Sequence, residues 1–155
     1  MSTTPTCFDV ERIGKVAHLR LNRPDAYNSM TREFWSELPA LVRELDDDGT
    51  VRAIVISSTG KHFSAGMDLA VFTGGGGDAL GGAATDGSRA EEGRVRARLL
   101  QSVRLLQDSF TALERVRMPV IAAIQGGCIG GAVDMVSACD LRYASADAFF
   151  CVQEI

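Results

Sequence analysis

The sequence predicts one α/β domain with a largely parallel β-sheet, spanning residues 1–155. Short runs rich in β-branched residues alternate with segments whose apolar residues recur at helical spacing, and this alternation is typical of that fold class. Two runs, within residues 51–60 and 119–126, are continuously apolar, as strands covered on both faces are. With 155 residues, of which 46% are apolar, the chain can bury one substantial core.

The first part of the chain is expected to form a hairpin followed by a helix. Residues 7–12 and 16–22 alternate between apolar and polar side chains on either side of Gly14, which predicts two short strands. Residues 31–49 carry apolar side chains at helical spacing, with Thr31 as a possible N-cap and a glycine at the end. This helix would lead into the first buried strand.

The second part is expected to return to the sheet through two helices. Residues 73–93 are rich in glycine and poor in large apolar groups, which predicts a mobile surface excursion. Apolar residues at helical spacing over 94–117 predict a long helix with its apolar stripe toward the core. A short buried helix over 129–139 and strands in 141–145 and 148–155 would complete the domain.

The charge balance argues against polyanionic partners. The formal net charge is −4 and the sequence pI is about 5.1, so the chain has no basic footprint for nucleic acid or an anionic membrane surface. No stretch approaches the ~20 apolar residues of a membrane span. An anionic ligand would therefore have to be held by local groups.

The cysteines and histidines indicate a reduced, metal-free protein. The four cysteines include no C-x-x-C pair, and three lie in apolar segments where a thiol packs as a small hydrophobe. The first ten residues lack the features of a secretory signal, so we expect a cytoplasmic protein. His18 and His62 are far apart and form no spaced ligand set with the cysteines, so no metal site is expected.

The stretch "GGCIGGAVD", residues 126–134, places glycines and an acid at the start of a helix that is apolar nearly all round. Gly130 and Gly131 would leave backbone N–H groups open to a ligand, and the helix start favours developing negative charge. Asp134 would be buried and would need partners or a shifted pKa, as acid–base groups have. Alternatively, the glycines serve tight packing and Asp134 is an ordinary partner of the helix dipole.

A second turn with small residues is "FSAGMDL", residues 63–69, after the strand in 51–60. It would lie near the carboxyl edge of the sheet, where open α/β folds bind ligands. The Met67 N–H, after Gly66, could share one oxyanion with an N–H of the other turn. Alternatively, this is an ordinary connection in which Asp68 caps the next turn.

These motifs carry a resemblance to a known family. "FSAGMDL", followed by "PVIAAIQGGCIGGAVDMVSACDLRYASADAFFCVQEI" and preceded by "LNRPDAYNSM", resembles the crotonase, or enoyl-CoA hydratase/isomerase, superfamily. Aspartate rather than glutamate at 134, with "CIGG" and "DAFFCVQE", most resembles its Δ3,5,Δ2,4-dienoyl-CoA isomerase subgroup. The resemblance implies a crotonase-like ββα spiral with a largely parallel sheet, of which this chain would hold the N-terminal portion without the usual C-terminal helical region.

The resemblance also implies an activity and a set of site residues. The family stabilises a thioester enolate with two backbone N–H groups, which fall on Met67 and Gly131 here, and its acid–base positions fall on Asp134 and Glu154. The implied reaction shifts double bonds in a dienoyl-CoA thioester during fatty acid β-oxidation, without a metal or redox cofactor, because coenzyme A belongs to the substrate. Further substrate and coenzyme A contacts are implied for Ala26, Tyr27, Ala65, Gly66, Asp68 and Gly130.

Two alternatives remain open beside the isomerase. The first is an enoyl-CoA hydratase, which would use acids at positions 134 and 154 to activate and deliver water. The second is a non-catalytic acyl-CoA-binding module. The binding module is favoured by the length of the family, which continues beyond the position of Ile155. That further region supplies another acid, more of the acyl pocket and the helices that pack the oligomers. We therefore expect a truncated chain, which would form a homo-trimer or hexamer only if that region is present.

Overall fold

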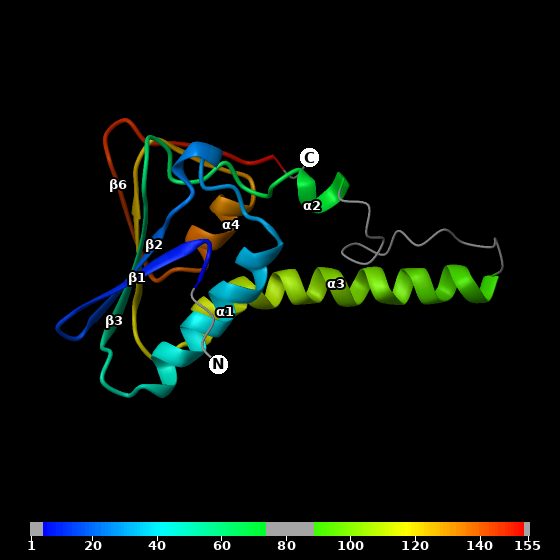
Figure 1. Cartoon of the computed structure of the whole chain (residues 1–155), viewed down its shortest axis with the longest axis horizontal. Coiled ribbons are helices and arrows are strands. Elements are labelled where there is room, and N and C mark those ends of the chain that lie inside the picture. The colour runs from blue at the N-terminus through cyan, green and yellow to red at the C-terminus, as the bar shows by residue number, and fades with distance from the viewer. Residues whose placement is uncertain (1–4, 74–88, 154–155) are drawn as a thin grey trace.

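The computed structural model describes residues 5–73 and 89–153. The described chain alternates between strands and helices (Figure 1), as the sequence predicted. The elements are β1 (Phe8–Ile13), β2 (Val16–Leu21), the 3₁₀ turn η1 (Pro24–Ala26), α1 (Arg32–Asp47), β3 (Ala53–Ser58), α2 (Ala70–Thr73), α3 (Arg89–Arg115), β4 (Val120–Ile124), β5 (Gly127–Ile129), α4 (Gly131–Ser137), β6 (Leu141–Ala144) and β7 (Phe149–Cys151).

The main sheet has the strand order β1-β2-β3-β4-β6. Only β1 and β2 pair antiparallel, as the predicted hairpin, and the other neighbours are parallel. The predicted α/β fold with a largely parallel sheet is thus confirmed. A separate parallel pair joins β5 to β7; of these two strands, the sequence pattern predicted only β7. Because β3 and β4 are parallel neighbours, the segments that follow them emerge at the same edge of the sheet.

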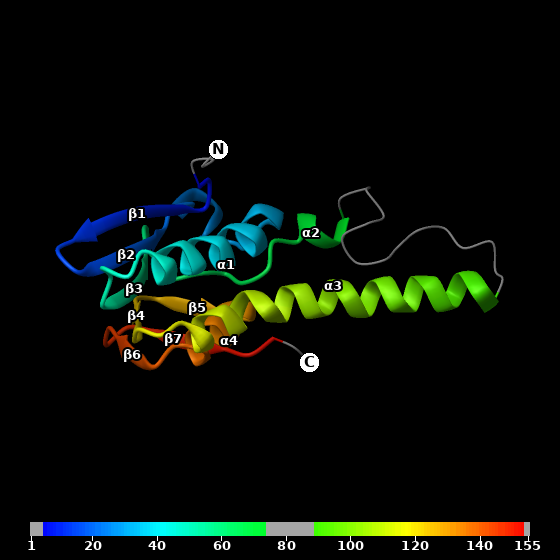
Figure 2. The ribbon, with the colours of Figure 1, turned by 90° about the horizontal axis from the view of Figure 1, so that it is seen from below.

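The core lies between one face of the main sheet and the helices. Figures 1 and 2 show α1, α3 and α4 on one side of the strands. Buried side chains of β3 and β4 pair in register, Ile54 with Val120 and Ile56 with Ala122, and they pack in one cluster with α1 and α4. The intervening residues are only half-buried. The two predicted buried strands of a parallel sheet are thus confirmed, with one face fully buried and the other half-buried.

Helix α3 departs most from its prediction. It begins at Arg89, inside the segment expected to be a mobile excursion, most of which (74–88) lies outside the described residues. Both views show its N-terminal part extending beyond the other helices (Figures 1 and 2). The stripe residues Leu99 and Val103 are 41% and 37% exposed, and the stripe reaches the core only at Phe110 and Leu113. The expected core-facing stripe is thus confirmed only at its C-terminal end.

The cysteines are free thiols, three of them buried. Burial raises the pKa of Cys128 and of Cys139 to about 12. At Cys139, the nearby Arg142 lowers the pKa and Asp140 raises it, but burial has the largest effect. Thiols in this state stay protonated, and the thiolate is the reactive form. The prediction that cysteines pack as small hydrophobes is thereby confirmed for Cys7, Cys128 and Cys139.

Alkylation of the native protein should therefore modify Cys151, the one half-buried cysteine, well before the others. Iodoacetamide labelling followed by peptide mass spectrometry measures the order of reaction. Labelling in denaturant should reach all 4 thiols at similar rates. Rapid labelling of Cys128 in the native protein would contradict the burial described above.

Candidate active site

The turn 63–69 is held on one side by the segment 27–30. Three backbone hydrogen bonds join them: Ala65 N–H to Tyr27 O (2.9 Å), Met30 N–H to Gly66 O (2.8 Å) and Asp68 N–H to Met30 O (3.0 Å). Successive peptide groups of an extended chain face opposite sides. The Met67 N–H therefore points away from segment 27–30, and it donates to no backbone acceptor in the described parts of the chain.

Strand β5 holds the same turn on its other side. Ser64 donates its N–H to Gly127 O (3.1 Å) and accepts the Ile129 N–H (3.0 Å). The chain then reverses at Gly130, whose φ of 53° favours glycine, and the Gly130 N–H is fixed to Cys151 O of β7 (2.9 Å). Helix α4 begins at the next residue. The two predicted turns are therefore neighbours, and strands fix both of them.

The turns meet at Gly66. Its φ is 81°, and a β-carbon there would lie 2.6 Å from Ile129 O and 3.3 Å from Gly131 N. These distances leave no room for a side chain, so glycine is required both by conformation and by space. The close approach brings Met67 and Gly131, the first residue of α4, to the wall of one cavity.

That cavity has a volume of about 820 Å³. Five residues that sequence reasoning selected line it: Ala65, Met67, Gly130, Gly131 and Asp134. Gln153 lines it too, whereas Glu154 lies outside the described residues. The roles of these residues in catalysis stay predictions.

Asp134 lies on the cavity wall but is exposed rather than buried. The buried face of α4 consists of Ala132, Met135 and Val136, which leaves position 134 pointing outward. The expectation of a fully buried Asp134 was therefore wrong. The sequence shows an almost uniformly apolar helix, but a seven-residue helix at the edge of a cavity buries only one side.

Helices α1 and α3 form the walls that sequence reasoning missed. Trp35 of α1 packs against Phe110 of α3 with ring centroids 5.3 Å apart, and both residues line the cavity. Leu106 adds apolar surface, and Glu114 brings a second acidic side chain to the lining. The helical periodicity did identify Leu106 and Phe110, but as core. The pattern marks an apolar face and cannot distinguish a packed core from a cavity wall.

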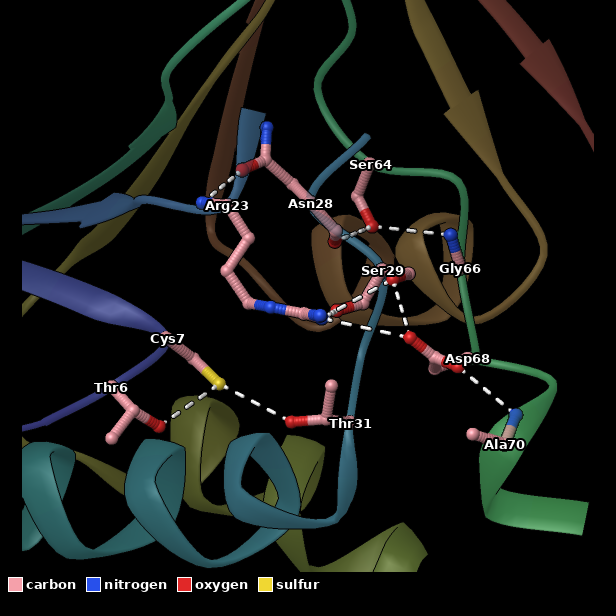
Figure 3. Close-up of polar contacts among 10 residues, drawn as sticks. All are labelled: Thr6, Cys7, Arg23, Asn28, Ser29, Thr31, Ser64, Gly66, Asp68 and Ala70. Atoms are coloured by element: carbon pink, nitrogen blue, oxygen red, sulfur yellow. Dashed lines mark hydrogen bonds and ion pairs between the residues drawn. The ribbon is translucent and has the colours of Figure 1, made fainter. Parts of the chain in front are cut away.

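Asp68 and Gly66 do not line the cavity. The Asp68 carboxylate accepts hydrogen bonds from the Ala70 N–H (3.0 Å) and the Ser29 hydroxyl (2.8 Å), and it lies 3.7 Å from the Arg23 guanidinium (Figure 3). The Ala70 amide, then Ser29 and Arg23, lower the pKa of Asp68. Asp68 therefore caps the next turn, and this role is compatible with an open N–H at Met67. Substrate contact by Asp68 stays a prediction.

Tyr27 lies at a second cavity, of about 250 Å³, together with His62, Ile129 and Phe149. Ala65 lines both cavities, so they adjoin across this residue. Ala26 lies in η1 and lines neither cavity. Tyr27 therefore lies next to the site, whereas Ala26 lies outside it.

The histidines have structural partners. His62 Nδ1 accepts the Gly127 N–H (2.9 Å), and His18 Nε2 lies 2.6 Å from the Ser57 hydroxyl. Among residues 5–73 and 89–153, no group of three or more histidine, cysteine or acidic side chains is placed to hold a metal ion. Over the same residues, no helix combines the length and apolarity that crossing a membrane requires.

Comparison with known proteins identifies relatives of this arrangement. The family model described as enoyl-CoA hydratase/isomerase matches residues 11–155. The peroxisomal Δ(3,5)-Δ(2,4)-dienoyl-CoA isomerase of Arabidopsis thaliana is 40% identical over 141 residues, covering 90% of this chain and 48% of the relative. The mitochondrial human enzyme of that name is 41% identical over 140 residues, covering 90% of this chain and 40% of that relative. The chain thus spans about half the length of the curated relatives it matches.

These relatives correct the expected location. The matched dienoyl-CoA isomerases are peroxisomal or mitochondrial, so the expectation of a cytoplasmic protein was wrong. It rested on reduced cysteines and on the composition of the first ten residues. Free thiols exclude only oxidising compartments, and they do not distinguish among reducing ones.

Solved structures share the fold. An enoyl-CoA hydratase from Mycobacterium smegmatis superimposes with a TM-score of 0.75 at 27% identity, covering 94% of this chain and 49% of that one. A protein of the enoyl-CoA hydratase type from Thermobifida fusca YX, in complex with acetoacetyl-CoA, superimposes with a TM-score of 0.76 at 32% identity. The match covers 96% of this chain and 54% of that one. With the family match extending over residues 11–155, the chain belongs to the enoyl-CoA hydratase/isomerase family.

Proposed function

We propose that the protein is an acyl-CoA isomerase that shifts double bonds in a dienoyl-CoA thioester, as part of fatty acid β-oxidation. The observation that carries this proposal is the meeting of the Gly66 turn with the start of α4, which puts Met67 and Gly131 on the wall of one cavity. The relatives named as dienoyl-CoA isomerases support the choice of reaction.

The two backbone N–H groups would bind the thioester oxygen. Removing a proton from the acyl chain leaves negative charge that spreads onto this oxygen, and donors already in place stabilise that charge without reorganising. Each such donor contributes ~3–4 kcal/mol to lowering the barrier. Met67 and Gly131 are suited to this role because backbone hydrogen bonds fix their turns, to segment 27–30 and β5 for the first and to β7 at Gly130 for the second.

Acidic side chains would move the protons. Asp134 lies three residues after Gly131, on the same cavity wall, and would act beside the bound thioester. Glu154, whose role rests on the family resemblance, would transfer the proton near the α-carbon. Shifting a diene removes one proton and returns one, with no net oxidation, so we propose that the reaction needs no resident cofactor or metal.

The cavities suggest where the substrate would lie. The apolar wall of Trp35, Leu106 and Phe110 suits an acyl chain. The adjoining cavity at Tyr27 suits part of the coenzyme A moiety, and Ala65 lies between the two. By the family resemblance, we also propose that the whole protein assembles as a homo-trimer or hexamer, which light scattering of the purified protein would measure.

Enoyl-CoA hydratase is the second candidate, because solved structures of that type share the fold. It would use the same N–H groups but would add water across a double bond. The aspartate at position 134 favours the isomerase, since it reaches one methylene less far than the glutamate of the hydratases. The third candidate is a protein that binds acyl-CoA without converting it.

Incubation with a 3,5-dienoyl-CoA and with crotonyl-CoA separates these candidates. We expect the first substrate to gain the ultraviolet absorbance of a diene conjugated with its thioester, and the second to remain unhydrated. Hydration of crotonyl-CoA without diene conversion would replace the proposal with the hydratase. Calorimetric binding of either substrate without turnover would indicate the binding module.

A further inference from the structure

We infer that Arg23, Ser29 and Asp68 form a clamp that positions the Met67 N–H, and that these three are positioning residues rather than ligand contacts. The clamp joins the segment after β2 to the turn that carries Met67 (Figure 3). The role of the Met67 amide in this inference rests on the proposed function, whereas the contacts of the clamp do not depend on the reaction.

The carboxylate at the centre of the clamp belongs to the residue directly after Met67. Asp68 Oδ2 accepts the Ser29 hydroxyl at 2.8 Å and lies 3.7 Å from Arg23 Nη1. The same Arg23 nitrogen donates to the carbonyl oxygen of Ser29 at 2.7 Å, so one guanidinium contacts both sides of the junction. Any shift of Asp68 away from segment 27–30 would lengthen these contacts together.

The second carboxylate oxygen fixes the other end of the turn. Asp68 Oδ1 accepts the Ala70 N–H at 3.0 Å, at the first residue of α2. Met67 therefore lies between the close packing at Gly66 and a residue whose two carboxylate oxygens are both engaged. The backbone bonds through Met30 form only an isolated bridge, which side-chain restraints would reinforce.

The clamp is half-shielded from water, with side-chain exposures of 29% at Arg23 and 23% at Asp68. The Asp68 carboxylate is ionised at neutral pH and accepts hydrogen bonds on both oxygens, and these bonds lower its pKa further. Electrostatic donors in active sites must stay within about 0.5 Å of their productive position. A residue that fixes the chain next to such a donor therefore affects catalysis without touching the substrate.

The test replaces Asp68 by alanine and by asparagine, and Ser29 by alanine. Because misplacement of a catalytic group by about 1 Å can cost roughly 100-fold in rate, we expect Asp68→Ala to lower kcat for the dienoyl-CoA about 10- to 100-fold with little change in KM. Asp68→Asn keeps one acceptor oxygen and should recover part of the loss. Asp9→Asn is the matched control, since Asp9 forms a comparable but exposed ion pair with Arg20 on the β1–β2 hairpin (3.9 Å).

Two further readouts do not depend on turnover. Acetoacetyl-CoA can ionise to an enolate that absorbs in the ultraviolet. We expect the protein to bind it in this form, and we expect the enolate absorbance to fall in Asp68→Ala. The NMR signal of the Met67 amide should shift or broaden in Asp68→Ala and in the milder Ser29→Ala, but not in Asp9→Asn. Because Asp68 is the sequence neighbour of Met67, the Ser29→Ala variant decides, and an unchanged Met67 signal in that variant overturns the inference. A shifted signal in a protein that neither isomerises nor stabilises the enolate supports the clamp and refutes the proposed function.

Discussion

Replacing Gly66 with alanine should lower kcat for isomerisation of a dienoyl-CoA by about 10²- to 10³-fold. A β-carbon at this position would lie 2.6 Å from Ile129 O and 3.3 Å from Gly131 N, so the two turns would have to separate. Separation would pull one N–H donor away from the thioester oxygen, and the loss of one such donor lowers kcat by about 10²- to 10³-fold. Initial rates with a 3,5-dienoyl-CoA, followed by product absorbance, measure the effect.

Gly14→Ala is the matched control for backbone strain. Gly14 has a φ of 62°, close to the left-handed value at Gly66, but no atom lies within 4 Å of the position of its β-carbon. Both variants should lose about 1–2 kcal/mol of unfolding free energy from the left-handed conformation. Only Gly66→Ala should add the cost of overpacking, of about 1–3 kcal/mol, and lose activity. Equal losses of activity in the two variants would mean that strain, and not the meeting of the turns, limits the enzyme.

Replacing Asp134 with asparagine should lower kcat by about 10²- to 10⁴-fold, which is the usual contribution of a positioned acid–base group. The side chain is exposed on the cavity wall, outside the buried face of α4, so the fold should tolerate the change. The free energy of unfolding should therefore stay within about 0.5 kcal/mol of its original value. Steady-state kinetics combined with chemical denaturation measure both quantities.

Glu44→Gln provides the control for loss of an acidic charge, because Glu44 is exposed on α1 and does not line the cavity. It should leave kcat unchanged. Asp134→Glu restores the residue of the hydratase subgroup, and it should raise hydration of crotonyl-CoA relative to isomerisation. Full activity in Asp134→Asn would remove Asp134 from the mechanism and leave the cavity without its proposed acid on α4.

Local patterns predicted the secondary structure well. The hairpin around Gly14, the helix after Thr31 and the two buried strands all lie within a few residues of their predicted bounds. Each depends on periodicity and on turn residues that act over a few positions. The short strand β5 was missed because its three residues, Gly127–Ile129, are too few to show a period.

The site was only partly predictable, for reasons that differ among its residues. The two glycine turns could be found because an open backbone needs glycine. The hydrogen-bond partners of Asp68 could not be predicted, because Arg23 and Ser29 are 45 and 39 positions away and no local pattern connects them. The exposure of Asp134 and the wall made by Trp35 depend likewise on how α1, α3 and α4 pack, which composition and spacing do not encode.

The anchoring of the Gly66 turn between segment 27–30 and β5 has a consequence for how such enzymes can diversify. The amides that would do the chemistry are fixed by strand ends, whereas Trp35 and Phe110, which shape the apolar wall, come from helices α1 and α3. Under the proposed function, substitutions in these helices would change which acyl groups the cavity accepts while the two amides stay in place. Reactivity and substrate range would then depend on separate parts of one small scaffold.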